Sequence, residues 1–452
     1  MRRALFEHEA KKVEKKYPKI QRVICAAGLT VLALLFLFWL GDGNGATAPE
    51  FLAALLTLLL FAALCLRFVP QWFSLWFGPE TPAREQKGLP LTAVFAIGLG
   101  CAFVNIALIW GIQHYVNHDL TPREFADFWK CADAYHYLCI ARDWYIPEGD
   151  LDRVVQLVFL PGYPLAVRAM FVLARDYTLA GMLVSILSFA GALCVIYRLV
   201  LLDHDEGTAL RTTVFLCLIP GAFFFTAPMS ESFFLLLSSA CLYSARKEKW
   251  LLAGVFGALA SFTRSLGLML FVPLFMEMVT SLLHGRRRAW RAAAALALVP
   301  MGFAAYCVIN YYVAGNPFQF LVYQKNHWYQ ELGLFFNTPA YQTRYALDAG
   351  KDDLMGLWLP NLAAIVFSLA ILISGAKKLR SSYTLWAIAY YVVAIGATWL
   401  LSAPRYMAVL LPIPMSLAYL SEKKKTRIAV IVILALSELY YLTMFALRRS
   451  VW

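Results

Sequence analysis

An apolar run, "LPLTAVFAIGLGCAFVNIALIWGI" from Leu89 to Ile112, contains no Asp, Glu, Lys or Arg, and comparable runs recur along the chain. A helix of about 20 such residues spans the roughly 30 Å hydrocarbon core of a bilayer. Backbone N–H and C=O groups find no water in lipid, so these segments must satisfy their hydrogen bonds internally as helices. The sequence therefore predicts an all-α, polytopic integral membrane protein.

The composition agrees with this class. Charged residues make up 15% of the 452 residues and hydrophobic residues 61%, whereas a soluble domain carries about 25% charged residues. The predicted spans are Val23–Leu40, Phe51–Leu66, Leu89–Ile112, Leu179–Leu202, Val214–Ala227, Phe233–Ala245, Trp250–Phe262, Leu266–Leu283, Ala293–Val313, Met355–Ile373, Tyr383–Leu401, Val409–Leu420 and Ile428–Leu447. A further candidate, Val154–Ala174, is interrupted by Pro161 and Pro164.

Basic clusters between the spans predict how the chain is oriented. The net charge of +12 is concentrated in these clusters and does not require a nucleic-acid partner. The clusters are the N-terminal segment 1–22, Arg246–Lys249, Arg286–Arg291, Lys377–Arg380 and Lys423–Arg427. From Arg246 onward, two predicted spans separate each neighbouring pair, so every cluster can face the cytoplasm.

The same assignment places residues 113–178 and 314–354 on the non-cytoplasmic face. The number of candidate spans between Lys87 and Arg246 is odd, so one of them must dip into the membrane or lie flat. We expect this of Val154–Ala174, because irregular backbone at membrane depth usually lines a protein cavity. The alternative is the Val214–Ala245 hairpin.

A polar patch on the predicted outer face, "WKCADAYHYLCIARDWY", is the first candidate for chemistry. Charges at the membrane edge are costly and tend to be functional. Asp133 in a semi-enclosed cavity could accept a hydroxyl proton as a general base; the alternative is a surface acid paired with Lys130 or Arg142. His136 lies one helical turn further on the same face. It could support Asp133 or be an ordinary structural histidine.

Three more charged residues are predicted at the same face. Glu231 opens the span that ends at Arg246, where it could bind substrate or cap the helix. Arg264 interrupts an apolar hairpin, and Arg405 lies at a turn in "SAPRY". Guanidinium groups match phosphate oxygens bidentately, so both arginines suit an anionic headgroup. Snorkelling toward lipid phosphates is the alternative for each.

The second outer segment combines Lys325 and His327 with many aromatic residues. It could form an interfacial aromatic belt or cover a sugar. No Walker loop, GxSxG or HExxH motif occurs in the sequence, so we expect no site for ATP or for a nucleotide sugar. The nine cysteines form no CxxC or Cys/His cluster, which indicates no metal site. A divalent metal is left open.

Three stretches of the chain form a pattern: "ADAYHYLCIARDWY", "VFLPGYPLAVR" and "FFFTAPMSESFFLLLSSACLYSARKEKWLLAGVFGALASFTRSLGL". Taken together, they closely resemble the PIG-V family of mannosyltransferases, within the wider GT-C superfamily of glycosyltransferases. The resemblance runs from about Phe125 to Leu268, with a weaker echo in "GNPFQFLVYQ" and "SAPRYMAVLLPIP". The sequence departs from the family at "WKCAD", where the acid usually follows a tryptophan directly, and at Ser265, where a proline is common. Residues 23–88 look like an added N-terminal hairpin before a catalytic domain of residues 89–452.

The resemblance implies a GT-C-type transmembrane bundle with a non-cytoplasmic catalytic loop. Asp133 would be the general base. The residues that would bind substrate are His136, Tyr137, Glu231, Arg264 and Arg405, with Lys325 and His327 as further candidates for the leaving phosphate.

The function so implied is inverting transfer of a hexose, with mannose the expected sugar. The expected partners are a polyprenyl-phosphate-linked sugar donor, a lipid or glycan acceptor and membrane lipids. The location would be a bacterial inner membrane with an outward-facing site, or an endoplasmic reticulum membrane. The rival predictions are a transporter or flippase of an anionic lipid or lipid-linked sugar, and a membrane scaffold.

Overall fold

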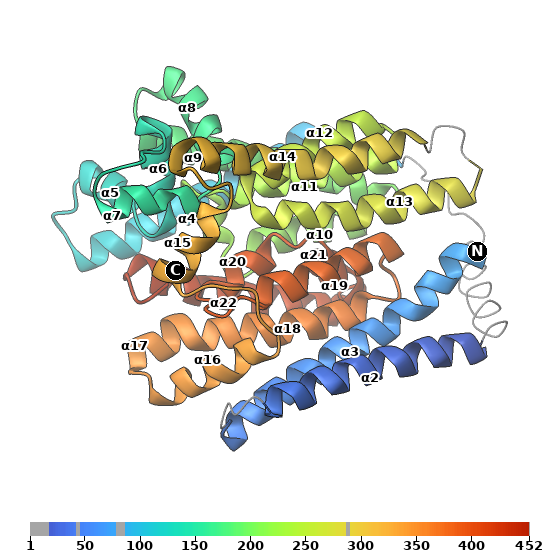
Figure 1. Ribbon diagram of the computed structural model, residues 1–452. Helices are drawn as coiled ribbons and strands as arrows, with labels where there is room; N and C mark the ends of the chain where they lie inside the picture. Colours follow the sequence, from blue (N-terminus) through green and yellow to red (C-terminus); the bar gives the residue numbers. More distant parts are fainter. Residues whose placement is uncertain (1–17, 42–45, 78–85, 286–289, 452) are drawn as a thin grey trace.

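The computed structural model describes residues 18–41, 46–77, 86–285 and 290–451. Most of the predicted segment 1–22 and of the basic cluster Arg286–Arg291 lies outside these ranges. The described chain is helical, which confirms the predicted all-α class, and its extended pairing is limited to an isolated bridge between Leu332 and Ala397. Most of the longer helices run roughly along one direction and form an elongated bundle (Figure 1).

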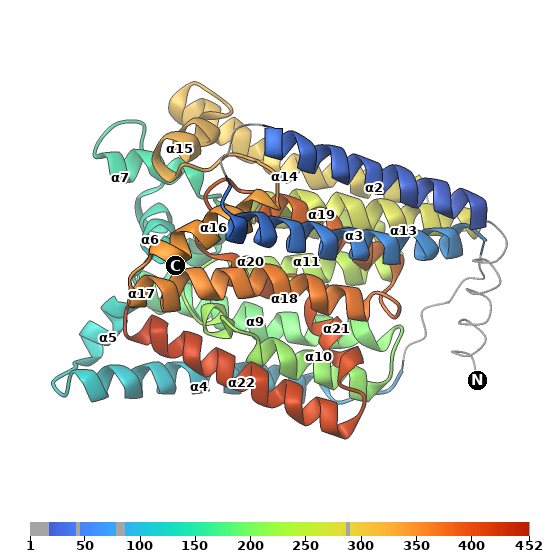
Figure 2. The same ribbon diagram turned by 90° about the horizontal axis from the view of Figure 1, so that it is seen from below.

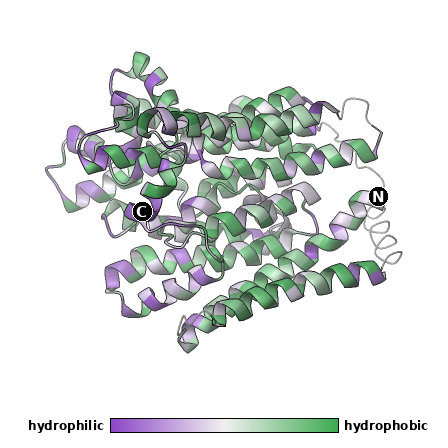
Figure 3. Ribbon diagram, viewed as in Figure 1, coloured by the Kyte–Doolittle hydropathy of each residue, from purple (hydrophilic) through white to green (hydrophobic). Residues whose placement is uncertain are grey.

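Eight helices of the described chain are long and apolar enough to cross a membrane. They are α2 (Pro18–Gly41), α3 (Ala48–Phe77), α4 (Leu91–Val116), α9 (Tyr177–Leu201), η3 (Ser265–Leu270) continued by α13 (Phe271–Leu283), α14 (Trp290–Ala314), α17 (Lys351–Asp353) continued by η4 (Leu354–Trp358) and α18 (Leu359–Gly375), and α22 (Lys424–Ala446). Hydrophobic residues dominate along these helices, and hydrophilic residues gather at the end that lies left in Figure 3. This is the pattern expected of an integral membrane protein.

Shorter helices pack between and against these spans. They are α10 (Glu206–Leu218), α11 (Glu231–Arg246), α12 (Trp250–Thr263), α19 (Ser381–Ile395), α20 (Ala403–Ala408) and α21 (Pro412–Leu420). The predicted span Val214–Ala227 is wrong at both ends. Asp205 caps α10 by accepting from the Thr208 N–H at 2.9 Å, so the helix begins earlier. It ends at Leu218 because a Pro-Gly pair follows, with Gly221 at φ +93° before the short helix η2 (Ala222–Phe225).

The Pro-interrupted segment is sharply bent. Helix α7 (Leu151–Val154) with η1 (Val155–Val158) meets α8 (Gly162–Ala174) at 110°, so this segment does not cross as one straight span. Two carbonyls at the bend are bonded inside the protein: Tyr306 Oη donates to Leu157 O at 2.6 Å, and Tyr145 Oη to Phe159 O at 2.5 Å. Irregular backbone at membrane depth requires such internal partners.

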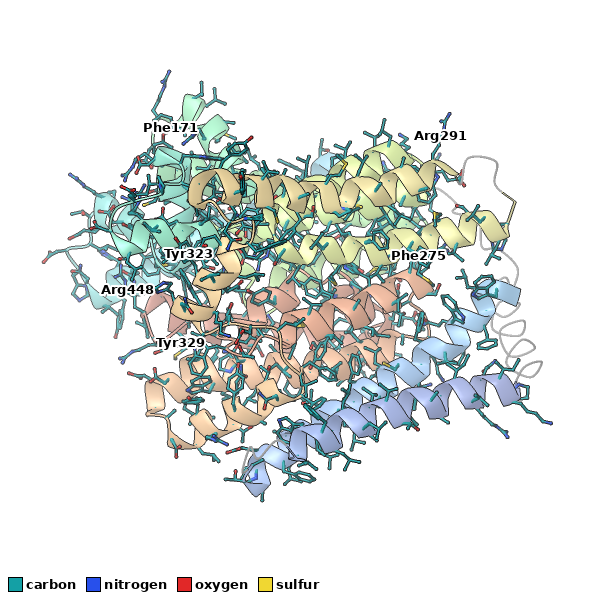
Figure 4. The ribbon with its side chains drawn as sticks, in the orientation of Figure 1. Phe171, Phe275, Arg291, Tyr323, Tyr329 and Arg448 are labelled. Atoms are coloured by element: carbon teal, nitrogen blue, oxygen red, sulfur yellow. The ribbon has the colours of Figure 1, made fainter. Side chains whose placement is uncertain are left out.

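Both predicted outer segments contain short helices and lie at one end of the bundle. These helices are α5 (Pro122–Phe128), α6 (Asp133–Asp143), α7, α8, α15 (Gln319–Trp328), α16 (Asn337–Asp348) and α17. In Figures 1 and 2 they lie at the left, together with the C-terminus. Figure 4 places Tyr323 and Arg448 at this end and Arg291 at the opposite end.

A buried ionic network fastens the opposite end. Arg246 bonds both oxygens of Asp203, at 2.5 and 2.7 Å, and Arg380 bonds both oxygens of Glu277, at 2.6 and 2.9 Å. Arg246 Nε also lies 3.9 Å from Glu277 Oε2, so the network ties the ends of α9 and α11 and the start of α19 to the middle of α13. Helix α11, about 24 Å long at 1.5 Å per residue, therefore has Arg246 anchored at one end and presents Glu231 at the other.

The predicted N-terminal hairpin packs against the rest of the bundle. Helices α2 and α3 contact each other, and α3 contacts α16, α18 and α19. Trp39 Nε1 donates to Asn337 Oδ1 at 2.8 Å, and Arg344 pairs with Glu50 at 2.7 Å. The hairpin is thus bonded to α16, a helix of the second predicted outer segment.

Candidate functional site

Four of the predicted residues, Asp133, Glu231, Arg264 and Arg405, meet in one ion-pair network, here called the ionic cluster. Arg405 Nη2 lies 2.7 Å from Asp133 Oδ2 and 2.7 Å from Glu231 Oε1. Arg405 Nε donates to the same Glu231 oxygen at 2.9 Å, and Arg264 Nη1 donates to it at 2.7 Å. Two acids and two cations from distant parts of the chain therefore share a single centre.

Local backbone geometry presents Asp133. It is the first residue of α6, and Ala132 before it adopts φ 46°, a conformation that L-residues rarely adopt. Trp129, 1% exposed, packs on Phe128 and Phe445 and fixes the preceding turn. Strain of this kind is held in place by its surroundings and is common at functional sites.

Glu231 and Arg264 are placed by breaks between helices. Glu231 begins α11 after Ser230, and Arg264 lies in extended backbone between α12 and η3. Arg264 Nη1 also donates to Ser230 Oγ at 3.0 Å. Gly162 at the start of α8 allows that helix to approach Thr263, because a Cβ there would lie 2.9 Å from Thr263 Cα.

Aromatic rings support both guanidinium groups. Arg405 lies over the Phe224 ring at 5.2 Å, and Arg264 over the Tyr406 ring at 5.2 Å. Tyr390 Oη donates to the Tyr406 backbone carbonyl at 3.0 Å. At these distances each ring attracts the guanidinium charge through a cation–π contact.

Exposure separates the two acids. The Asp133 side chain is 35% exposed, whereas those of Glu231 and Arg405 are 1% and 4% exposed and that of Arg264 is 10% exposed. Asp133 is therefore the most exposed member of the cluster. Glu231 holds two guanidinium groups in place from the interior.

The structure bears on the structural alternatives for these residues, which were a surface ion pair for Asp133, a helix cap for Glu231 and snorkelling for the two arginines. Lys130 pairs with Asp127 at 2.6 Å and Arg142 with Asp143 at 2.9 Å, so neither neutralises Asp133. Glu231 lies in the first turn of α11, and its Oε1 accepts from both arginines. The side chains of Arg264 and Arg405 are 10% and 4% exposed, so they point into the protein instead of snorkelling outward.

His136 and Tyr137 lie beside the cluster. The His136 ring stacks on Phe159 at 4.7 Å, and Trp328 meets Phe159 at 6.0 Å. Burial lowers the pKa of the His136 imidazole below its usual 6.5, with the Asp133 charge acting in the opposite direction. Its Nδ1 is buried without a hydrogen-bond partner. Tyr137 Oη bonds Ser230 Oγ at 2.9 Å, which links α6 to the loop before α11.

Lys325 and His327 lie outside the ionic cluster. Lys325 forms an exposed ion pair with Glu331 at 2.8 Å. His327 is exposed and lies against the Tyr323 ring. The structure therefore brings neither side chain to Asp133, although their helix, α15, contributes Trp328 to the aromatic wall near His136.

Sequence reasoning missed Glu438, which supports the cluster from α22. Its carboxylate accepts from three successive backbone N–H groups, those of Gly221 at 2.6 Å, Ala222 at 3.1 Å and Phe223 at 2.9 Å. This turn carries Phe224 beneath Arg405. A lone acid inside an otherwise apolar span was the sequence signal that could have identified it.

No group of three or more His, Cys, Asp or Glu side chains within the described ranges could hold a metal ion. All nine cysteines are free.

No family model matches the chain, and the comparison with curated proteins finds no match. Among solved structures, the chain is similar to an Archaeoglobus fulgidus oligosaccharyltransferase tethered with an acceptor peptide, with a TM-score of 0.38 and 13% identity over 71% of this chain and 51% of that chain. It is also similar to the oligosaccharyltransferase AglB from Archaeoglobus fulgidus in complex with an inhibitory peptide and a dolichol-phosphate, with a TM-score of 0.39 and 11% identity over 78% of this chain and 56% of that chain.

A third structure, of the Archaeoglobus fulgidus oligosaccharyltransferase with Zn and sulfate, has a TM-score of 0.42 and 14% identity over 72% of this chain and 49% of that chain. The matches thus span about half the length of these enzymes. The likeness is too distant to assign an activity to this chain.

Proposed function

We propose that this protein is an inverting membrane glycosyltransferase. It moves a hexose, with mannose the expected sugar, from a polyprenyl-phosphate donor to a lipid-linked or glycan acceptor. The observation that carries the proposal is the shared guanidinium: Arg405 bonds both the more exposed Asp133 and the buried Glu231. An accessible acid next to fixed cations is what transfer from a sugar phosphate requires.

The accessible acid supports a single displacement. A double displacement needs a carboxylate nucleophile in addition to an acid–base group. Glu231 is unsuited to that task, because its side chain is 1% exposed and its Oε1 accepts from two arginines. Asp133 alone then acts as base, and one displacement inverts the anomeric centre.

The proton and the charge move together in this scheme. The acceptor oxygen bonds to the anomeric carbon while the bond from that carbon to the phosphate oxygen breaks, and the electron pair leaves with the phosphate. The hydroxyl proton passes to Asp133, which becomes neutral. Arg405 then carries positive charge that Asp133 no longer balances, at the moment when the phosphodiester becomes a more highly charged monoester. Arg264 adds a second fixed cation close by.

The test is transfer by the purified, full-length protein in lipid. It is incubated with a panel of polyprenyl-phosphate hexoses and a membrane extract, products are identified by mass spectrometry, and their anomeric configuration is determined by NMR. We expect one acceptor to gain a hexose of inverted configuration, and Asp133→Asn to abolish the product. Asp143→Asn is the matched control, since Asp143 ends the same helix and pairs at the surface with Arg142 and Arg153.

Undiminished transfer by Asp133→Asn would remove the base from this scheme. If no donor is consumed and intact lipid-linked sugar instead crosses reconstituted vesicles, the transporter interpretation replaces the proposal.

A further inference from the structure

A groove lies on the flank of the bundle between α3 and α18, within the half that faces away from the ionic cluster. Its volume is about 470 Å³, and it is lined by Leu60, Arg67, Ala370, Ile373, Ser374 and Lys377. Its residues take no part in the proposed sugar transfer.

Helical spacing explains the shape of this groove. Residues 60 and 67 lie two turns apart on one face of α3, and residues 370, 373, 374 and 377 follow the matching face at the end of α18. The two helices run side by side in the same direction (Figure 1), and Gln71 Nε2 bonds the carbonyl of Ala376 and, at 3.4 Å, that of Leu379. Along each helix, the residues that line the groove are therefore apolar first and end in a cation, Arg67 on α3 and Lys377 at the end of α18.

The two cations of the groove are not neutralised by the described protein. Neither Arg67 nor Lys377 pairs with an acid in the described ranges, and both are exposed. The neighbouring basic residues are already engaged, since Lys378 pairs with Glu422 at 2.9 Å and Arg380 with Glu277 at 2.6 Å. Two like charges facing one groove favour an anion between them.

The surroundings indicate what kind of anion fits. Leu60, Ala370 and Ile373 give the groove an apolar floor, and the groove opens on the outside of a membrane-spanning bundle. An acyl chain covers such a floor, whereas a soluble anion would leave it bare. The groove lies in the part of the bundle where α3 and α18 end, near the predicted cytoplasmic cluster Lys377–Arg380, and basic sites between spans on that side attract anionic lipids.

We propose that this groove binds an anionic glycerophospholipid of the cytoplasmic leaflet. Its phosphate would lie between Arg67 and Lys377, and one acyl chain would lie along Leu60 and Ile373. The site joins the N-terminal hairpin to α18, so an occupied groove strengthens the attachment of that hairpin to the bundle. This inference does not depend on the proposed sugar transfer.

The experiment measures lipid binding to the full-length protein in detergent by native mass spectrometry and by the lipid-induced rise in melting temperature. The probes are dioleoylphosphatidylglycerol, dioleoylphosphatidylcholine and inorganic phosphate. We expect phosphatidylglycerol to bind and stabilise, and the other two to do so much less. Arg67→Gln/Lys377→Gln keeps most of the apolar stems and should weaken phosphatidylglycerol binding roughly 30-fold, from about 1 kcal/mol for each cation lost.

Lys424→Gln/Lys425→Gln is the matched control, because it removes two exposed lysines near the same end of the bundle. It should bind phosphatidylglycerol as the wild type does. Arg67→Lys/Lys377→Arg preserves both charges and should also retain binding, which separates loss of the site from loss of folding. Equal phosphatidylglycerol binding by the Gln double variant would overturn the proposal. So would an equal stabilisation by inorganic phosphate or by phosphatidylcholine.

Discussion

Arg405 donates to Asp133 at 2.7 Å although 272 residues separate them in the chain. The same nitrogen also bonds the buried Glu231 at 2.7 Å. Whatever moves one acid relative to Arg405 therefore changes the environment of the other. The predictions below test separate parts of this arrangement.

Replacing the buried acid should destabilise the fold. Glu231→Gln leaves the buried guanidinium of Arg264 without an acid and leaves Arg405 paired with Asp133 alone. Breaking a buried pair in this way costs about 3–5 kcal/mol. We expect a large fall in melting temperature in detergent. Asp143→Asn breaks surface pairs with Arg142 and Arg153 and should cost no more than about 1 kcal/mol for each. Equal stability of the two variants would contradict the role given to Glu231.

Acid should destabilise the site through His136. Burial lowers its pKa in the folded protein below the ordinary 6.5, so below that pH the unfolded chain binds more protons than the folded chain. The free energy of unfolding should then fall as the pH drops from about 7 through 6.5 toward the lowered value. Melting temperatures measured across this range check the slope. His136→Phe should flatten it, and His327→Phe, on exposed α15, should leave it unchanged.

Adding one methyl group at Gly162 should disturb the loop that holds Arg264. A Cβ there would lie 2.9 Å from Thr263 Cα, so α8 must shift, at a cost of about 1–3 kcal/mol. Sugar transfer by Gly162→Ala should fall together with its melting temperature. Gly100→Ala meets nothing within 4 Å and serves as the control. Normal transfer and stability of Gly162→Ala would show that this close approach is dispensable.

Removing Glu438 should loosen the support beneath Arg405. Glu438→Ala leaves three backbone N–H groups without their acceptor, at about 1–3 kcal/mol for a buried donor left unpaired. Phe224 in that turn would lose its fixed position, so we expect slower transfer at saturating substrate as well as a lower melting temperature. Glu331→Ala, which breaks the exposed pair with Lys325, should change neither.

The ionic cluster was predictable in membership but not in geometry. Basic clusters at alternate span ends place Asp133, Glu231, Arg264 and Arg405 on one face, because each intervening pair of spans returns the chain to the same side. Counting spans in this way predicts the side of the membrane for each residue. It does not predict which residue is buried or which carboxylate oxygen is shared. Those properties depend on the packing of α6, α11 and α20, which distant contacts decide.

Sequence reasoning failed where local geometry overrides hydropathy. The run Val214–Ala227 reads as one apolar segment, yet the helix ends at Leu218 because Gly221 turns the backbone into a positive φ. Lys325 pairs with Glu331, six positions further along the chain. The sequence did not predict this pair, because it depends on the conformation of the loop between the two residues. The break within Val154–Ala174 was predicted, because Pro161 and Pro164 interrupt this run.

The most direct test of the account is the rate of hexose transfer by Asp133→Asn relative to wild type. It should be measured under single-turnover conditions with Asp143→Asn as the control. Loss of a general base predicts a rate about 10²- to 10⁴-fold lower, with donor binding retained and the control unaffected. A rate within a few-fold of wild type, in a folded variant that still binds donor, would contradict the assignment of Asp133 as the base.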